Sequence, residues 1–174
     1  MGYNIPMNLH VILVHFPIAL LTVYAVAELI RFRKITTLPY WFYLKAVLAI
    51  IGALAAWAAA VAGSAIEDQF RGPLHRLVEV HSEFAFVSIL IFSLIAILYV
   101  LAWLKRDNAS MAQKLPPGLM RAAEMILNGW MIVVLALVGL TAITVTGALG
   151  GAIAFGPQVD PIANFVYNLL GLNS

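Results

Sequence analysis

Four stretches of this chain are apolar and long enough to cross a lipid bilayer, and they limit its fold more than any other feature. The stretches are Val11–Ile30, Ala46–Ile66, Phe84–Leu104 and a longer one from Leu127 to about Ala154. A hydrocarbon core of about 30 Å is crossed by about 20 helical residues. No alternating pattern of apolar and polar residues indicates strands. We therefore expect an all-α integral membrane four-helix bundle, with residues 1–174 forming a single transmembrane domain.

The composition excludes several other classes of protein. Of the 174 residues, 63% are hydrophobic and 10% are charged, whereas a soluble domain has roughly a quarter of its residues charged. The net charge of +2 is too small for a nucleic-acid-binding face. Because cysteine is absent, disulfides, thiolate metal sites, iron–sulfur clusters and c-type haem attachment are excluded. The four histidines remain as the main candidates for chemistry.

The basic residues predict how the chain is oriented in the membrane. Eight of the ten lie in or beside the links after the first and third stretches, namely Arg31, Arg33, Lys34, Lys45, Lys105, Arg106, Lys114 and Arg121, and only Arg71 and Arg76 lie in the remaining link. Basic links stay in the cytoplasm. We therefore expect both termini on the outer side of a multi-pass protein of the bacterial inner (cytoplasmic) membrane.

A short helix is expected after the fourth stretch. Asp160 is a good N-cap and is followed by Pro161, which suits the first position of a helix. The segment from about 161 to 170 has apolar residues on one face and is too short to span the membrane. Such an amphipathic helix is predicted to lie in the outer interface.

With this topology, all four histidines gather at the outer ends of two helices. His10 and His15 enter the first helix, and His75 and His81 enter the third. At 1.5 Å per residue the two pairs are separated by about 7.5 and about 9 Å of helix. His15 and His81 are therefore predicted to form a deeper couple, with His10 and His75 as a shallower one. Two ligands at similar depth on different helices suit a metal or an iron porphyrin.

The two histidines of the third helix differ in their surroundings. His81 shares a helix face with apolar residues such as Leu77 and Val78, whereas His75 lies on a polar flank with Glu79 and Glu83. An imidazole among apolar residues needs a partner. For His81 that partner is either a metal or a backbone carbonyl, and for His75 water alone suffices.

Charged and small residues surround the predicted cluster. Arg71 and Arg76 are candidates to pair with haem propionates, and Glu79 and Glu83 are candidates to join His75 as non-haem metal ligands. The alternative for all of them is a solvated helix end. The small residues are alanines in the outer half of the second helix, and Thr144, Thr146, Gly147, Gly150 and Gly151 in the fourth. They either let helices approach closely or leave space for a flat macrocycle.

Two motifs resemble a known family. Residues His10–Leu20 read H-V-I-L-V-H-F-P-I-A-L and Thr146–Gly156 read T-G-A-L-G-G-A-I-A-F-G. The first is similar to the opening signature of a bacterial family of four-span membrane proteins of unknown function (domain of unknown function twenty-two thirty-one, DUF2231), with Val11 in place of the usual proline. Some relatives are joined to cytochrome-type domains, so the resemblance implies haem and a redox membrane. It singles out His10, His15, Gly147, Gly150 and Gly151.

These observations favour a membrane-embedded b-type haem-binding electron-transfer subunit, with bis-His ligation near the periplasmic face. His15 and His81 are the first choice of ligands, and His10 and His75 are a second pair, which gives one or two haem b groups. The alternatives are a non-haem Cu, Fe or Zn site, or a structural or assembly subunit of a respiratory complex. We expect a non-catalytic subunit rather than a stand-alone enzyme.

The expected partners follow from the same reasoning. They are the lipid bilayer, a periplasmic cytochrome or larger respiratory complex, and further copies of the chain, with no nucleic acid among them.

Overall fold

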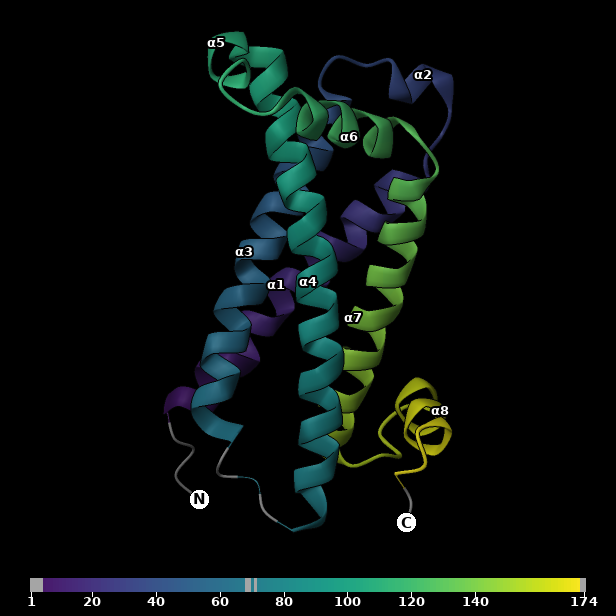
Figure 1. The fold of residues 1–174 in the computed structure, drawn as a ribbon. Helices are drawn as coiled ribbons and strands as arrows, with labels where there is room; N and C mark the ends of the chain where they lie inside the picture. Colours follow the sequence, from purple (N-terminus) through teal and green to yellow (C-terminus); the bar gives the residue numbers. More distant parts are fainter. Residues whose placement is uncertain (1–4, 68–69, 71, 173–174) are drawn as a thin grey trace.

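The computed structural model describes residues 5–67, 70 and 72–172, and within these ranges all the regular structure is helical. Four long helices form the bundle in Figure 1: α1 (Ile5–Leu29), α3 (Trp41–Glu67), α4 (Pro73–Asp107) and α7 (Met131–Phe155). Four shorter helices connect or follow them: α2 (Arg33–Thr36), α5 (Ala109–Ala112), α6 (Pro117–Asn128) and α8 (Pro161–Leu169). Each long helix is apolar enough to cross a membrane. The predicted all-α membrane bundle is confirmed.

The long helices form a ring in the order α1, α3, α4 and α7. Each packs against its two neighbours in this order, so α1 and α4 lie diagonally across the bundle, as do α3 and α7. The contact between α1 and α7 is the least extensive of the four, and that between α1 and α3 is the most extensive. The ring therefore has a weak seam between its first and last helices.

Small residues explain the close packing of two of these pairs. At Gly52 on α3, an added Cβ would collide with the side chain of Leu21 on α1. At Gly139 on α7, it would come within 2.8 Å of Cζ of Phe92 on α4. Without a hydrophobic driving force between helices in lipid, such close van der Waals contact is a main source of their attraction. Glycine at these positions therefore sets how near the helices lie.

Three of the four long helices begin before their predicted apolar windows, and the last begins after its window. α4 begins at Pro73 and so contains His75 and His81, as expected, and it starts well before the apolar window at Phe84 because its polar first turns fail a hydropathy criterion but continue the same helix. Its 35 residues extend about 52 Å, so it projects beyond the hydrocarbon core. The fourth span begins at Met131 instead of Leu127, because α6 ends at Asn128 and the backbone is extended at Gly129.

The two ends of the bundle have different additions. At the histidine end, where α1 and α4 begin and α3 and α7 end, α8 lies beside α7 (Figure 1). At the opposite end, the Glu28 end, α6 crosses the bundle and packs on α4 and α7. Asp160 caps α8 by accepting hydrogen bonds from the amides of Ile162 and Ala163 at 2.8 Å. The predicted cap and short helix are therefore present.

α8 packs with only part of its apolar surface. Ala163 and Val166 are buried against α4 and α7, whereas Ile162, Phe165 and Leu169 are exposed. An exposed apolar stripe on a helix too short to span fits the interfacial position predicted for it.

Candidate functional site

His10 reaches from α1 to the small-residue face of α3. Its Nδ1–H donates a hydrogen bond to the main-chain carbonyl of Ala59, with an N···O distance of 2.9 Å. The ring lies against Gly63, where an added Cβ would come within 2.9 Å of the His10 Cε1 atom. The bare backbone at this glycine therefore makes room for the imidazole. The small residues on α3 thus leave room for a histidine ring.

His81 makes the equivalent contact from α4 to α7. Its Nδ1–H donates to the main-chain carbonyl of Thr146 at 2.9 Å. A Cβ added to Gly150 would lie 3.4 Å from the His81 Cε1 atom, so this glycine also borders an imidazole ring. Both histidines are partly buried, and each is held by the helix that neighbours its own.

These hydrogen bonds determine which ring nitrogen carries the proton. A carbonyl oxygen can only accept a hydrogen bond, so Nδ1 is the protonated nitrogen in both rings. In a neutral imidazole the lone pair is then on Nε2. Neither Nε2 atom has a hydrogen-bond partner among the described residues. A metal-ligating histidine usually donates the N–H of its other ring nitrogen to a carbonyl or carboxylate in this way, which fixes the orientation of the ring.

The structure makes His10 and His81 the two histidines that point into the bundle, whereas depth along the helix had paired His81 with His15. His10 on α1 bonds to α3 and His81 on α4 bonds to α7, although α1 and α4 are diagonal in the bundle. The His15 ring is exposed, and its Nδ1–H donates to the carbonyl of Val11 on its own helix at 2.6 Å. The predicted pairing used only the rise per residue along each helix and left out the rotation of the helix about its own axis. In the structure, the rotation of α1 directs His10 inward and leaves His15 on the surface.

The remaining charged candidates lie on the surface of the first turns of α4. His75, Arg76, Glu79 and Glu83 are all exposed, and Arg71 lies outside the described residues. In the part of the chain that the structure describes, no three His, Asp or Glu side chains are grouped so that they could hold a metal. The structure therefore does not assemble His75, Glu79 and Glu83 into a ligand set.

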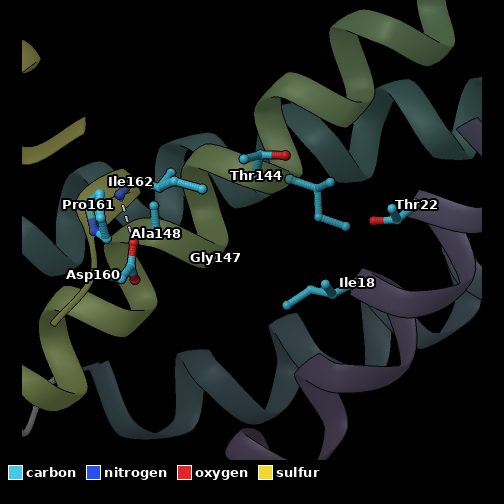
Figure 2. Close-up of a pocket in the computed structure, with 9 residues that line it drawn as sticks. Ile18, Thr22, Thr144, Gly147, Ala148, Asp160, Pro161 and Ile162 are labelled. Carbon is cyan, nitrogen blue, oxygen red and sulfur yellow. Dashed lines mark hydrogen bonds between the residues drawn. The ribbon is translucent and has the colours of Figure 1, made fainter. Parts of the chain in front are cut away.

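The three glycines of α7 occupy different environments. Gly150 borders His81, and Gly151 faces the loop before α8, where an added Cβ would lie 3.7 Å from Val159 and 4.0 Å from Asp160. At Gly147 an added Cβ would meet nothing within 4 Å. Gly147 lines a groove of about 570 Å³ between α1, α7 and the start of α8, shown in Figure 2. An added Cβ would make only ordinary van der Waals contacts at Gly150 and Gly151, and open space surrounds Gly147.

A second polar cluster, at the Glu28 end, was not identified as a site from the sequence. Glu28 is only 1% exposed. Its Oε1 atom lies 2.9 Å from Nζ of Lys45 and 3.6 Å from Nη2 of Arg31, and its Oε2 atom accepts a 2.8 Å hydrogen bond from the Tyr99 hydroxyl. The signal was present, because Glu28 is the only charged residue in the first apolar stretch, and an ionisable residue within a span usually has a partner inside the bundle.

Comparison with known proteins gives one match. A family model described as a predicted membrane protein (DUF2231) matches residues 6–161. No curated protein and no solved structure matches the chain. The matched range contains both His10 and His81, the three glycines of α7 and the cap residue Asp160.

Proposed function

Since the chain belongs to the DUF2231 family of predicted membrane proteins, we propose that it is a b-type haem-binding electron-transfer subunit with His10 and His81 as the axial ligands. The observation that supports this most is the shared arrangement of the two rings. Each donates Nδ1–H to a main-chain carbonyl of a neighbouring helix, at 2.9 Å in both cases, and so keeps a lone pair on Nε2. This is the state in which imidazole binds a metal.

The number of protein ligands favours a haem over a bare metal ion. A protein site for zinc uses at least three side-chain ligands, and the described residues offer no group of three. A porphyrin supplies four nitrogens itself and needs only axial ligands from the protein. Two neutral imidazoles from diagonal helices therefore fit the donor set of a bis-histidine haem. When bound, the iron would carry one electron at a time, at a potential set by ligands, burial and hydrogen bonding.

The distribution of charge supports a location of this site near the periplasmic face of the bacterial inner membrane. Arg31 and Lys45 belong to the Glu28 end, and Lys105 and Arg106 are in the last turn of α4 at the same end. Positively charged ends stay in the cytoplasm, which leaves the histidine end outside. A periplasmic cytochrome or a larger respiratory complex would then be the partner that exchanges electrons with the subunit.

The test is the absorption spectrum of the purified full-length protein, expressed with ample haem and recorded oxidised and reduced. We expect a Soret band that shifts on reduction, with one haem per chain by pyridine haemochrome assay. Absence of the band in protein supplied with haem would overturn the proposal. Copper, iron or zinc found by elemental analysis without porphyrin would also overturn it, in favour of a non-haem metal site.

A further inference from the structure

The groove between α1 and α7 is distinct from the histidine pair. It lies at the seam where the ring of helices has its least extensive contact. Its apolar walls include Ile18 on α1, Ile143 on α7 and Ile162 at the start of α8. Because the groove is open along the side of the bundle between two membrane-spanning helices, a molecule dissolved in the bilayer can reach it without crossing water.

Polar groups lie at two separate ends of this groove. Figure 2 shows the hydroxyl groups of Thr22 and Thr144 directed toward the space between α1 and α7, with Asp160 at the other end. The Thr144 hydroxyl donates its proton to the carbonyl of Leu140 at 2.7 Å, so toward a ligand it can only accept. The Asp160 carboxylate is also an acceptor, because its Oδ1 atom already caps α8. At the Asp160 end a ligand must donate a hydrogen bond, whereas at the threonine end it can donate to Thr144 or accept from Thr22, whose hydroxyl has no hydrogen-bond partner among the described residues.

The charge of the groove limits the head group of such a ligand. No Lys or Arg is among its lining residues in the described part of the chain, and Asp160 adds a negative charge. A phosphate head group would therefore be repelled at one end and would have no cationic partner. Between the two ends lies Gly147, where the backbone faces open space. A flat, uncharged group can lie against this stretch of α7.

We propose that the groove binds a lipid-soluble hydroquinone. A para-hydroquinone is a flat neutral ring that carries hydroxyl donors at opposite ends, and its apolar tail would leave through the open side toward the lipid. One hydroxyl donates to the threonine end, and the other donates to the carboxylate of Asp160. The oxidised quinone has only carbonyl acceptors, which would face that carboxylate without a proton between them. The Asp160 end of the groove therefore favours the reduced form.

The position of the groove relates it to the histidine pair, although its binding is a separate property. Gly147, which lines the groove, follows Thr146, whose carbonyl accepts the hydrogen bond from His81. A hydroquinone held there would lie beside the helix segment that anchors a proposed haem ligand. Binding itself requires only the groove, and it can be measured whatever the haem content of the protein.

The test measures binding of a decyl-substituted benzohydroquinone to the full-length protein in phosphatidylcholine nanodiscs, under anaerobic conditions and relative to empty nanodiscs. We expect saturable binding, weakened about tenfold or more by G147L. This substitution fills the groove from a position where the new side chain meets no protein atom within 4 Å of its Cβ. The matched control is V138L, at an exposed position of α7 outside the groove, which should bind like the wild type.

A second variant tests the selectivity for the reduced form. D160N keeps a good N-cap for α8 but removes the charge, so it should reduce the preference for hydroquinone over the matching quinone. The proposal is overturned if the wild type shows no saturable binding, if G147L binds normally, or if diacylglycerol or phosphatidylglycerol competes as well as the hydroquinone. An unchanged preference in D160N would overturn the role of Asp160. None of these outcomes depends on whether the protein binds haem, so the binding test can fail or succeed independently of the proposed function.

Discussion

The two ends of the helix bundle both carry polar side chains within apolar helices, but they satisfy them differently. At the Glu28 end, both carboxylate oxygens have partners, supplied by Lys45, Arg31 and Tyr99. At the histidine end, His10 and His81 each use only one ring nitrogen in a hydrogen bond within the described residues. The Glu28 carboxylate is fully paired, although the buried Tyr24 hydroxyl on the same helix has no hydrogen-bond partner among the described residues. The histidine end keeps lone pairs suited to a metal.

The difference separates a structural cluster from a candidate site. Polar groups buried in a membrane protein need partners, because no water is present in the hydrocarbon core. Glu28 links α1 to α3 through Lys45 and to α4 through Tyr99, so it connects three of the four spans. The histidines also link helices, through Ala59 and Thr146, but these links orient the rings and leave Nε2 available.

The largest effect on stability is expected from removing a partner of the buried Glu28 carboxylate. K45A leaves the buried Glu28 carboxylate without its nearest cation, and loss of one partner of a buried ion pair typically costs about 3–5 kcal/mol. Arg31, 3.6 Å away, compensates in part, which places the expected loss near the lower value. Unfolding of the protein in mild detergent, followed by circular dichroism, measures it.

The surface ion pair between Lys105 and Glu124 provides the control for this variant. Its side chains are 46% and 41% exposed, so K105A should cost no more than about 1 kcal/mol. Equal losses in K45A and K105A would contradict the structural role assigned to Glu28.

A smaller effect on stability, with a specific effect on the site, is expected at the histidine end. In G63A the new Cβ would lie 2.9 Å from the His10 ring, so the ring must move away from its bond to Ala59. Alanine gains roughly 0.5–1 kcal/mol over glycine in a helix, which offsets part of the strain. We expect haem content to fall by more than half while the unfolding midpoint changes little. G147A, where the Cβ meets nothing, is the control, and full haem content in both variants would argue against His10 as a ligand.

Much of the fold was predictable from the sequence, because membrane helices are specified by long apolar stretches. The second and third predicted windows lie within α3 and α4, and Asp160-Pro161 marked the start of α8 correctly. The apolar windows differ from the helix starts at Pro73 and Met131 for one reason. Hydropathy identifies the residues that are apolar enough for the hydrocarbon core. A helix, in contrast, continues through polar residues and ends where its backbone changes direction.

The pairing of the histidines could not be predicted in the same way. α1 is apolar on all sides, so no pattern in its sequence shows which face meets α3. Whether His10 or His15 points inward depends on contacts such as that between Leu21 and Gly52, which set the rotation of α1. The sequence located the histidine end of the bundle, and only packing between helices distinguished its members.

The most direct test of this account compares the absorption spectra of three single-histidine variants, H10A, H81A and H15A, purified in parallel with the wild type. If His10 and His81 are the axial ligands, H10A and H81A lose the bis-histidine haem spectrum, while H15A keeps it with the same haem content as the wild type. Loss of the spectrum in H15A together with its retention in H10A would contradict the account. In that case His15 and His81 would be the ligands, as depth along the helices predicted.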